Sequence, residues 1–299
     1  MPRRTVILAL AAAAALAICG CGTTPAPAGL SVVAAENFWG SIASQLAGST
    51  AKVTSIITNP ATDPHSYEPT SADARTMAEA RLAIVNGIGY DAWASRLLSA
   101  SPLAGRRVLN VGSRLGIGAG GNPHQWYSPA VVAEVSRAIT ADLVRLAPAR
   151  RAYLEARLHW FQTRALARYH SLIATIRARF SGAPIGYSES IFAPLGTALG
   201  LRFETPPSFA RAVAEGTEVS AADLLTVERQ ASRREIRVWV FNSQNATPEV
   251  AHVNALARAA GVPVATVTET LSPATDSFEQ WQVSELEGLL RALERGTKH

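Results

Sequence analysis

The chain has 299 residues, a formal net charge of +5 and two cysteines. The positive charge comes almost entirely from arginines that form no cluster interleaved with aromatic residues, so we expect no nucleic-acid binding. Both cysteines lie within the first 21 residues, which leaves the rest of the chain without a disulfide or a thiolate ligand. The remaining length, about 270 residues, exceeds the usual size of one hydrophobic core and favours two lobes.

The N-terminal segment is typical of an export signal. Arg3 and Arg4 precede the apolar run TVILALAAAAALAI, which is too short for a stable bilayer span but suits the core of a signal peptide. The run ends in ICGC, which resembles a bacterial lipobox with Cys21 as the lipidated residue. We therefore expect residues 1–20 to be a lipoprotein signal peptide and Cys21 to anchor an extracytoplasmic protein to the cell membrane. An ordinary secretory signal and an N-terminal membrane anchor are the alternatives.

Residues 21–29 are rich in Pro, Ala, Thr and Gly, which predicts a flexible tether. An N-terminal α/β lobe is expected over residues 30–147, where short β-branched runs alternate with helical stretches. The predicted strands are 30–35, 52–58, 82–87 and 107–111, and the predicted helices lie near 37–47, 71–80 and 90–100. This alternation indicates βαβ units around a parallel sheet.

A long helical stretch, residues 148–181, follows the first lobe. Apolar residues recur every three or four positions from Leu154 to Phe180, with no Gly or Pro between them. One continuous helix over residues 148–180 would be about 50 Å long and would join the lobes stiffly. Two helices with an unmarked break are the alternative.

The strand and helix rhythm returns over residues 182–299, the predicted C-terminal α/β lobe. Its predicted strands are 183–188, 201–204, 236–242 and 262–268, and its predicted helices lie near 190–199, 220–234 and 248–260. Ser128 and Thr247 each precede a proline, which predicts a helix N-cap at both positions. The predicted fold class is α/β, with two Rossmann-like lobes, each a parallel sheet flanked by helices, joined by one long rigid α-helix.

Two of the six histidines, His65 and His124, occupy proline-marked loops that follow strands. In parallel α/β sheets the ligand crevice lies beyond the carboxyl ends of the strands, so both loops should open onto one cleft. The neighbouring aromatic residues Tyr67 and Trp126 can shield each imidazole from water, and a neutral imidazole is a common metal ligand. We expect surface or capping roles for the others, His159, His170, His252 and His299.

The motifs NPATDPHSYEPT and GNPHQWYSP, together with the long central helix, resemble the substrate-binding lipoproteins of zinc and manganese ABC importers. The resemblance implies that His65 and His124 are metal ligands. It places a third ligand at Glu189, in GYSESIFAPLGTALGL, and a fourth at Asp276, in LSPATDSFEQWQ, where Glu279 is the alternative. It also implies a monomeric receptor that passes its ion to an ABC permease and is not an enzyme.

The four implied donors suit a divalent cation. Two neutral imidazoles and two carboxylates bring a charge of −2, which cancels that of the ion and avoids burying net charge. Oxygen donors make Mn²⁺ or Fe²⁺ more plausible than an all-nitrogen site would, although Zn²⁺ binds such sites more tightly than Mn²⁺. The stretch before His124 carries none of the extra histidines frequent in zinc receptors of this kind, which slightly favours Mn²⁺.

Two other classes of function are alternatives. The first is a secreted zinc-dependent hydrolase that uses the same donors. Catalytic zinc sites keep one position open for water, whereas all four donors are used here and no HExxH motif occurs. The second is a binding module for a metal chelate or another small solute, which would need a wider and more aromatic pocket.

Overall fold

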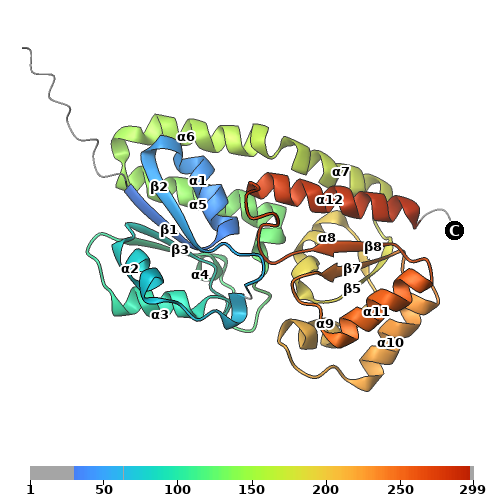
Figure 1. Ribbon diagram of the computed structural model, residues 1–299. Coiled ribbons are helices and arrows are strands. Elements are labelled where there is room, and N and C mark those ends of the chain that lie inside the picture. Colours follow the sequence, from blue (N-terminus) through green and yellow to red (C-terminus); the bar gives the residue numbers. More distant parts are fainter. Residues whose placement is uncertain (1–29, 63, 297–299) are drawn as a thin grey trace, which may run out of the picture.

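Two parallel four-stranded sheets form the centres of two lobes in the computed structural model, which describes residues 30–62 and 64–296 (Figure 1). Cys21, the signal peptide and the tether lie outside the described residues. Each sheet is covered by helices on both faces, which explains why the central strands of each sheet are almost continuously apolar. The predicted two-lobed α/β fold is therefore confirmed. No helix in the described part of the chain combines the length and apolarity needed to span a bilayer.

The sheet of the first lobe has the strand order β2-β1-β3-β4. Its strands are β1 (Leu30–Glu36), β2 (Ala51–Ile57), β3 (Leu82–Val85) and β4 (Arg107–Asn110). Its helices are α1 (Asn37–Ala47), α2 (Ser71–Glu79), α3 (Ala92–Ala100), α4 (Val111–Leu115) and α5 (Pro129–Leu146). The order reverses between β1 and β3, which makes that point the natural crevice of the sheet.

The second sheet repeats this topology with the order β6-β5-β7-β8. Its strands are β5 (Pro184–Tyr187), β6 (Arg202–Phe203), β7 (Val238–Asn242) and β8 (Val264–Val267). Its helices are α8 (Ala193–Leu199), α9 (Pro207–Ala214), α10 (Ala221–Ser232), α11 (Pro248–Ala259) and α12 (Phe278–Arg295). Helices α4 and α9 have no counterpart among the helices predicted from the sequence. The predicted N-caps at Ser128 and Thr247 are confirmed, because each hydroxyl accepts a backbone N–H of its helix's first turn.

The linking segment contains a π-helical turn in its middle. It consists of α6 (Arg151–Trp160), a π-helix over Phe161–Ala165 and α7 (Ala167–Phe180). The N–H of Leu166 donates to the carbonyl of Phe161, five residues back, at 3.0 Å. Both residues are buried, and the extra residue of the π turn brings Leu166 onto the packed face. The segment thus follows the predicted helical path but is not one regular α-helix.

The lobes share their largest hydrophobic cluster, and each lobe also has a smaller cluster of its own. A single apolar cluster runs from Val32 and Trp39 of the first lobe, through Phe161 and Tyr169 of the linker, to Leu293 of α12. Helix α12 lies along α7 and contacts α1, so the C-terminal segment reaches back to the first lobe (Figure 1). This continuous packing disfavours a wide hinge motion between the lobes.

Candidate metal centre

The carboxyl ends of the strands of both sheets face each other where the lobes meet. His124 lies after β4 in the first lobe, whereas Glu189 follows β5 and Glu269 follows β8 in the second lobe. A hollow of about 350 Å³ beside His124 connects this region with the surface. Its wall includes Tyr90, Asn122, Tyr187 and Ser190. The geometry agrees with the rule that ligands of open α/β sheets bind beyond the strand ends.

The ring of His124 is fully buried and held in one orientation. Its Nδ1 lies 2.8 Å from Oδ1 of Asn122, which also accepts the backbone N–H of His124 at 3.0 Å. The Nδ2 amide of Asn122 donates to the carbonyl of Ser190 across the lobe boundary at 2.7 Å. Because this fixes Oδ1 as an acceptor, Nδ1 of His124 carries the hydrogen and Nε2 presents its lone pair to the site. Trp126 packs against the imidazole, as predicted, with 5.2 Å between the two ring centroids.

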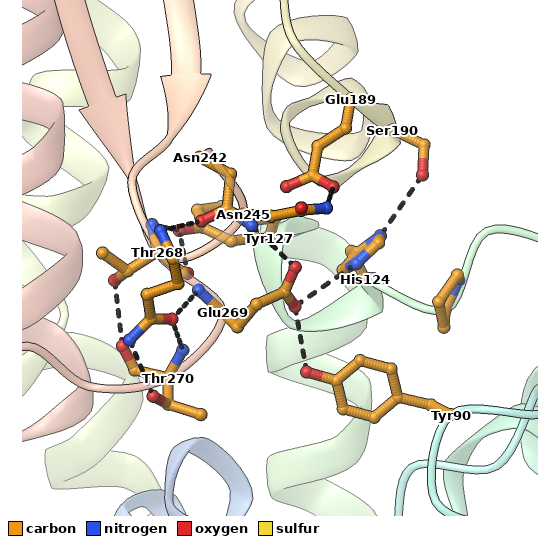
Figure 2. A network of polar contacts seen from close by, with 12 residues as sticks. Tyr90, His124, Tyr127, Glu189, Ser190, Asn242, Asn245, Thr268, Glu269 and Thr270 are labelled. Atoms are coloured by element: carbon orange, nitrogen blue, oxygen red, sulfur yellow. Dashed lines mark hydrogen bonds and ion pairs between the residues drawn. The ribbon is translucent and has the colours of Figure 1, made fainter. Parts of the chain in front are cut away.

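Glu269 faces His124 from the other lobe (Figure 2). Its Oε2 lies 3.3 Å from His124 Nε2 and accepts the hydroxyl hydrogen of Tyr90 at 2.9 Å. Its Oε1 accepts the Nδ2 amide of Asn242 at 2.8 Å. The carboxylate is thus oriented by groups from both lobes and is almost completely buried. Its sequence position, two residues after β8, is the edge where a parallel sheet exposes its ligand-binding residues.

Glu189 supplies a second buried carboxylate. Its Oε2 accepts the Nδ2 amide of Asn245 at 2.9 Å, whereas its Oε1 is buried and has no hydrogen-bond partner among the described residues. Burial raises the pKa of Glu189 to about 7, and repulsion from Glu269 adds to the rise. His124 and the side-chain amides of Asn242 and Asn245 act in the opposite direction. A buried carboxylate with an unused oxygen, next to another carboxylate, is an arrangement that a bound cation would stabilise.

The loop after β7 holds these carboxylates through side-chain amides. Asn242 donates to Glu269 and Asn245 donates to Glu189. The Oε1 atom of Gln244 accepts the backbone N–H groups of Glu269 at 2.6 Å and Thr270 at 3.1 Å. Neither asparagine is among the site residues predicted from the sequence. Their amides fix the orientation of both carboxylates, a role that neutral donors can fill without neutralising the site.

A pair of carboxyl groups is buried beneath the loop that carries Tyr90. Asp91 accepts the backbone N–H groups of Asn86 at 2.6 Å and Gly87 at 2.7 Å, which folds this loop so that Tyr90 reaches Glu269. Glu36, at the end of β1, is fully buried beside it. Burial raises the pKa of Glu36 well above its usual range, and the Asp91 carboxylate raises it further. Burial also raises the pKa of Asp91 to about 6. Burial and the neighbouring Asp91 carboxylate thus both favour the protonated form of Glu36.

Replacing Glu36 by glutamine should stabilise the protein at pH 8 by on the order of 1 kcal/mol and leave its stability at pH 4 unchanged. A carboxyl whose pKa is raised in the folded state contributes stability below its unfolded pKa, and this contribution is lost as the pH rises through the folded pKa. Glutamine keeps the shape but cannot ionise. Urea denaturation at both pH values measures the effect, with the exposed Glu79→Gln as control. A variant that is less stable than wild type at pH 8 would contradict the raised pKa of Glu36 in the folded protein.

The predicted site residues are placed as follows. The structure brings His124 and Glu189 to the same region, where Glu269 joins them (Figure 2). The backbone of His65 lies in a 3-10 turn, Pro64–Ser66, after β2, but its side chain lies outside what the structure describes. Among the described side chains, no group of three His, Cys, Asp or Glu is arranged closely enough to hold a metal ion by itself.

Asp276 lies away from His124 and Glu189. After Thr270 the chain crosses back to the first lobe, where the N–H of Leu271 donates to Asn37 and that of Phe278 donates to Ser41. Asp276 lines a separate hollow there with residues of α1 and β2, and Glu279 accepts a hydrogen bond from Gln45 at 2.8 Å. The structure therefore places Glu269, and neither Asp276 nor Glu279, beside His124 and Glu189. The sequence signal was available, because Glu269 is the first acidic residue after the last strand.

Comparison with known proteins agrees with this architecture. A 129-residue stretch, 40% of the chain, is 28% identical to the manganese-binding lipoprotein MntA of Halalkalibacterium halodurans and spans 41% of that relative's length. The Mn-bound periplasmic metal-binding protein of Candidatus Liberibacter asiaticus superposes with a TM-score of 0.72 at 19% identity, over 88% of this chain and 99% of that chain. A mutant of the laminin-binding adhesin Lmb from Streptococcus agalactiae superposes with a TM-score of 0.68 at 21% identity, over 89% of this chain and 100% of that chain. These structures establish the likeness of fold.

The family model described as ZnuA, zinc-uptake complex component A, periplasmic, matches residues 32–292. This range covers both lobes and the linker between them. The chain therefore belongs to the ZnuA family, which confirms the resemblance to substrate-binding proteins of zinc and manganese importers.

Proposed function

We propose that the protein captures one divalent transition-metal ion, Mn²⁺ or Zn²⁺, between its lobes and delivers it to the permease of an ABC importer. The proposed ligands are His65 and His124 from the first lobe and Glu189 and Glu269 from the second. The observation that carries the proposal is the contact of 3.3 Å between His124 Nε2 and Glu269 Oε2. Beside it lies the buried carboxylate of Glu189, whose Oε1 has no hydrogen-bond partner among the described residues.

The charge balance supports a divalent cation as cargo. Without an ion, two buried carboxylates repel each other, which contributes to the raised pKa of Glu189. With an ion, two neutral imidazoles and two carboxylates would leave the buried site neutral. The mixed nitrogen and oxygen donors suit Mn²⁺, Fe²⁺ and Zn²⁺, and this set contains no thiolate that would favour softer ions. A manganese-binding relative and Mn-bound and Cd-bound structural neighbours support the same class of cargo.

The site has the properties of a receptor that binds and releases its ion. The second-lobe donors lie on short loops that follow strands, while the lobes share their largest hydrophobic cluster. Release therefore requires movement of these loops or a small tilt of the second lobe rather than a wide opening. We further propose that the tether at residues 21–29, which begins with the lipidated Cys21, holds this receptor at the outer face of the cell membrane, near its permease.

Equilibrium dialysis of the purified mature chain against Mn²⁺ and against Zn²⁺ tests the proposal. We expect one ion per chain, and we expect His65→Ala and His124→Ala to lower the affinity by at least roughly 100-fold, because each removes an ion ligand. His159→Ala is a matched control, since His159 is exposed on α6. The absence of saturable binding, or binding that is unchanged in both ligand variants, would refute the proposed function.

A further inference from the structure

Tyr127 links the two lobes directly behind the proposed metal centre (Figure 2). It is the third residue after His124 and is fully buried. Its hydroxyl lies 2.7 Å from Oε2 of Glu285 on α12 and 2.8 Å from the carbonyl oxygen of Thr268. Thr268 directly precedes Glu269. One phenol hydroxyl of the first lobe therefore contacts the chain segment that presents Glu269.

Glu285 holds the same segment from the other side. Its Oε1 accepts the backbone N–H of Thr268 at 2.9 Å, the Thr268 hydroxyl at 3.1 Å and the indole N–H of Trp281 at 2.9 Å. Together with Tyr127, it engages the amide, the hydroxyl and the carbonyl of Thr268. Neither residue is a donor in the proposed ligand set. The ring of Tyr127 packs in the apolar core, but this packing explains neither its hydroxyl nor the Glu285 carboxyl.

The hydrogen atoms of this network can be assigned by counting donors. The single hydroxyl hydrogen of Tyr127 faces two acceptors, the Thr268 carbonyl and Glu285 Oε2. Both contacts are satisfied if Glu285 is protonated, because its hydroxyl then donates to Tyr127 while Tyr127 donates to Thr268. Burial raises the pKa of Glu285 to about 8, although its hydrogen bonds act in the opposite direction, which agrees with a neutral carboxyl.

We infer that Tyr127 and Glu285 are positioning residues that set the spacing between His124 and Glu269. His124 begins the turn that carries Tyr127, and Glu269 follows the residue to which Tyr127 and Glu285 bind. A shift at Thr268 would move the Glu269 carboxylate away from His124 Nε2. Such outer hydrogen bonds commonly change metal affinity by about 10- to 100-fold. The inference rests on the proposed function, since it concerns the geometry of the same site.

Tyr127→Phe tests the inference because it removes only the hydroxyl and keeps the ring. We expect the Mn²⁺ affinity to fall about tenfold and the visible absorption spectrum of the Co²⁺-loaded protein to change, because the ligand geometry changes. Tyr169→Phe is the matched control. Tyr169 is also buried, but its hydroxyl has no hydrogen-bond partner among the described residues, so its loss should alter neither readout.

Substitutions at Glu285 separate positioning from simple stability. Glu285→Gln can still donate to Tyr127 and accept from Thr268, so we expect its Mn²⁺ affinity to stay within about threefold of wild type. Glu285→Met has a similar size but cannot form these bonds, and should behave like Tyr127→Phe. If Tyr127→Phe does not fold, the difference in Mn²⁺ affinity between Glu285→Gln and Glu285→Met tests the positioning role by itself. Wild-type affinity and spectrum in Tyr127→Phe or Glu285→Met would overturn the inference, whereas failure of the wild-type chain to bind Mn²⁺ would overturn the proposed function instead.

Discussion

Replacing Glu269 by glutamine should lower the affinity for Mn²⁺ by about 100-fold or more, while Asp276→Asn should leave it unchanged. Glutamine has the size of glutamate and can still accept the hydrogen bond from Tyr90. It removes one of two negative charges that would compensate a buried cation, and breaking such a pair typically costs about 3 kcal/mol or more. Asp276 lies in a different hollow and has no contact with His124 or Glu189 among the described residues.

The same substitution should stabilise the metal-free protein. Repulsion from Glu269 contributes to the raised pKa of Glu189, so the loss of the Glu269 charge relieves part of that repulsion. A substitution that merely damaged the fold would lower both affinity and stability. Thermal unfolding of the metal-free variant and calorimetric titration with Mn²⁺ together distinguish these cases. Unchanged affinity in Glu269→Gln, combined with a large loss in Asp276→Asn, would return the fourth ligand to Asp276.

Metal affinity should fall as the pH is lowered below 7. The fall should be about tenfold per pH unit, because the ion must displace one proton from Glu189. Burial and repulsion from Glu269 raise the pKa of this carboxyl to about 7 in the metal-free protein. An ion requires the ionised carboxylate, so below pH 7 a proton must leave before the ion can bind. Above pH 7 the Glu189 carboxyl is already ionised, so it adds no further dependence of metal affinity on pH.

Calorimetric titration with Mn²⁺ at pH 6 and pH 8.5, in two buffers that differ in ionisation enthalpy, measures the number of protons released. We expect Glu189→Gln to release about one proton fewer than wild type at pH 6 and the same number at pH 8.5. Its affinity should also be lower at both pH values, since one ligand charge is missing. Equal proton release by wild type and variant at pH 6 would contradict the role of Glu189. Because its folded pKa is raised, the contribution of Glu189 to stability is present at low pH and is lost as the pH rises through 7.

Most of the fold could be predicted from local sequence patterns. The alternation of β-branched runs with amphipathic stretches placed the strands of both sheets, since each pattern reflects which faces of an element are buried. The caps at Ser128 and Thr247 followed from the chemistry of the first helical turn. The π turn at Phe161–Ala165 could not be foreseen, because the pattern permits several helical registers and packing selects one of them.

The candidate site could be predicted in part. His124 is marked by its own neighbours, a proline before it and a tryptophan two residues after it, and Glu189 was placed by the family resemblance. Glu269 is marked only as the first acidic residue after the last strand, and local patterns do not distinguish it from the acidic residues that follow Thr270. The roles of Asn242 and Asn245 depend on contacts with residues far away in the chain, which local patterns do not encode.

The sequence by itself determined the strand and helix succession, the division into two lobes and the presence of histidines at strand ends, because each follows from residues close together in the chain. Only the tertiary structure decided which carboxylate from the second lobe faces His124. That choice depends on where the chain crosses back to the first lobe after Thr270, and this crossing is set by packing of α12 against α7 and α1. The same packing places Tyr127 against Thr268 and Glu285, although these residues are separated by well over one hundred positions in the sequence.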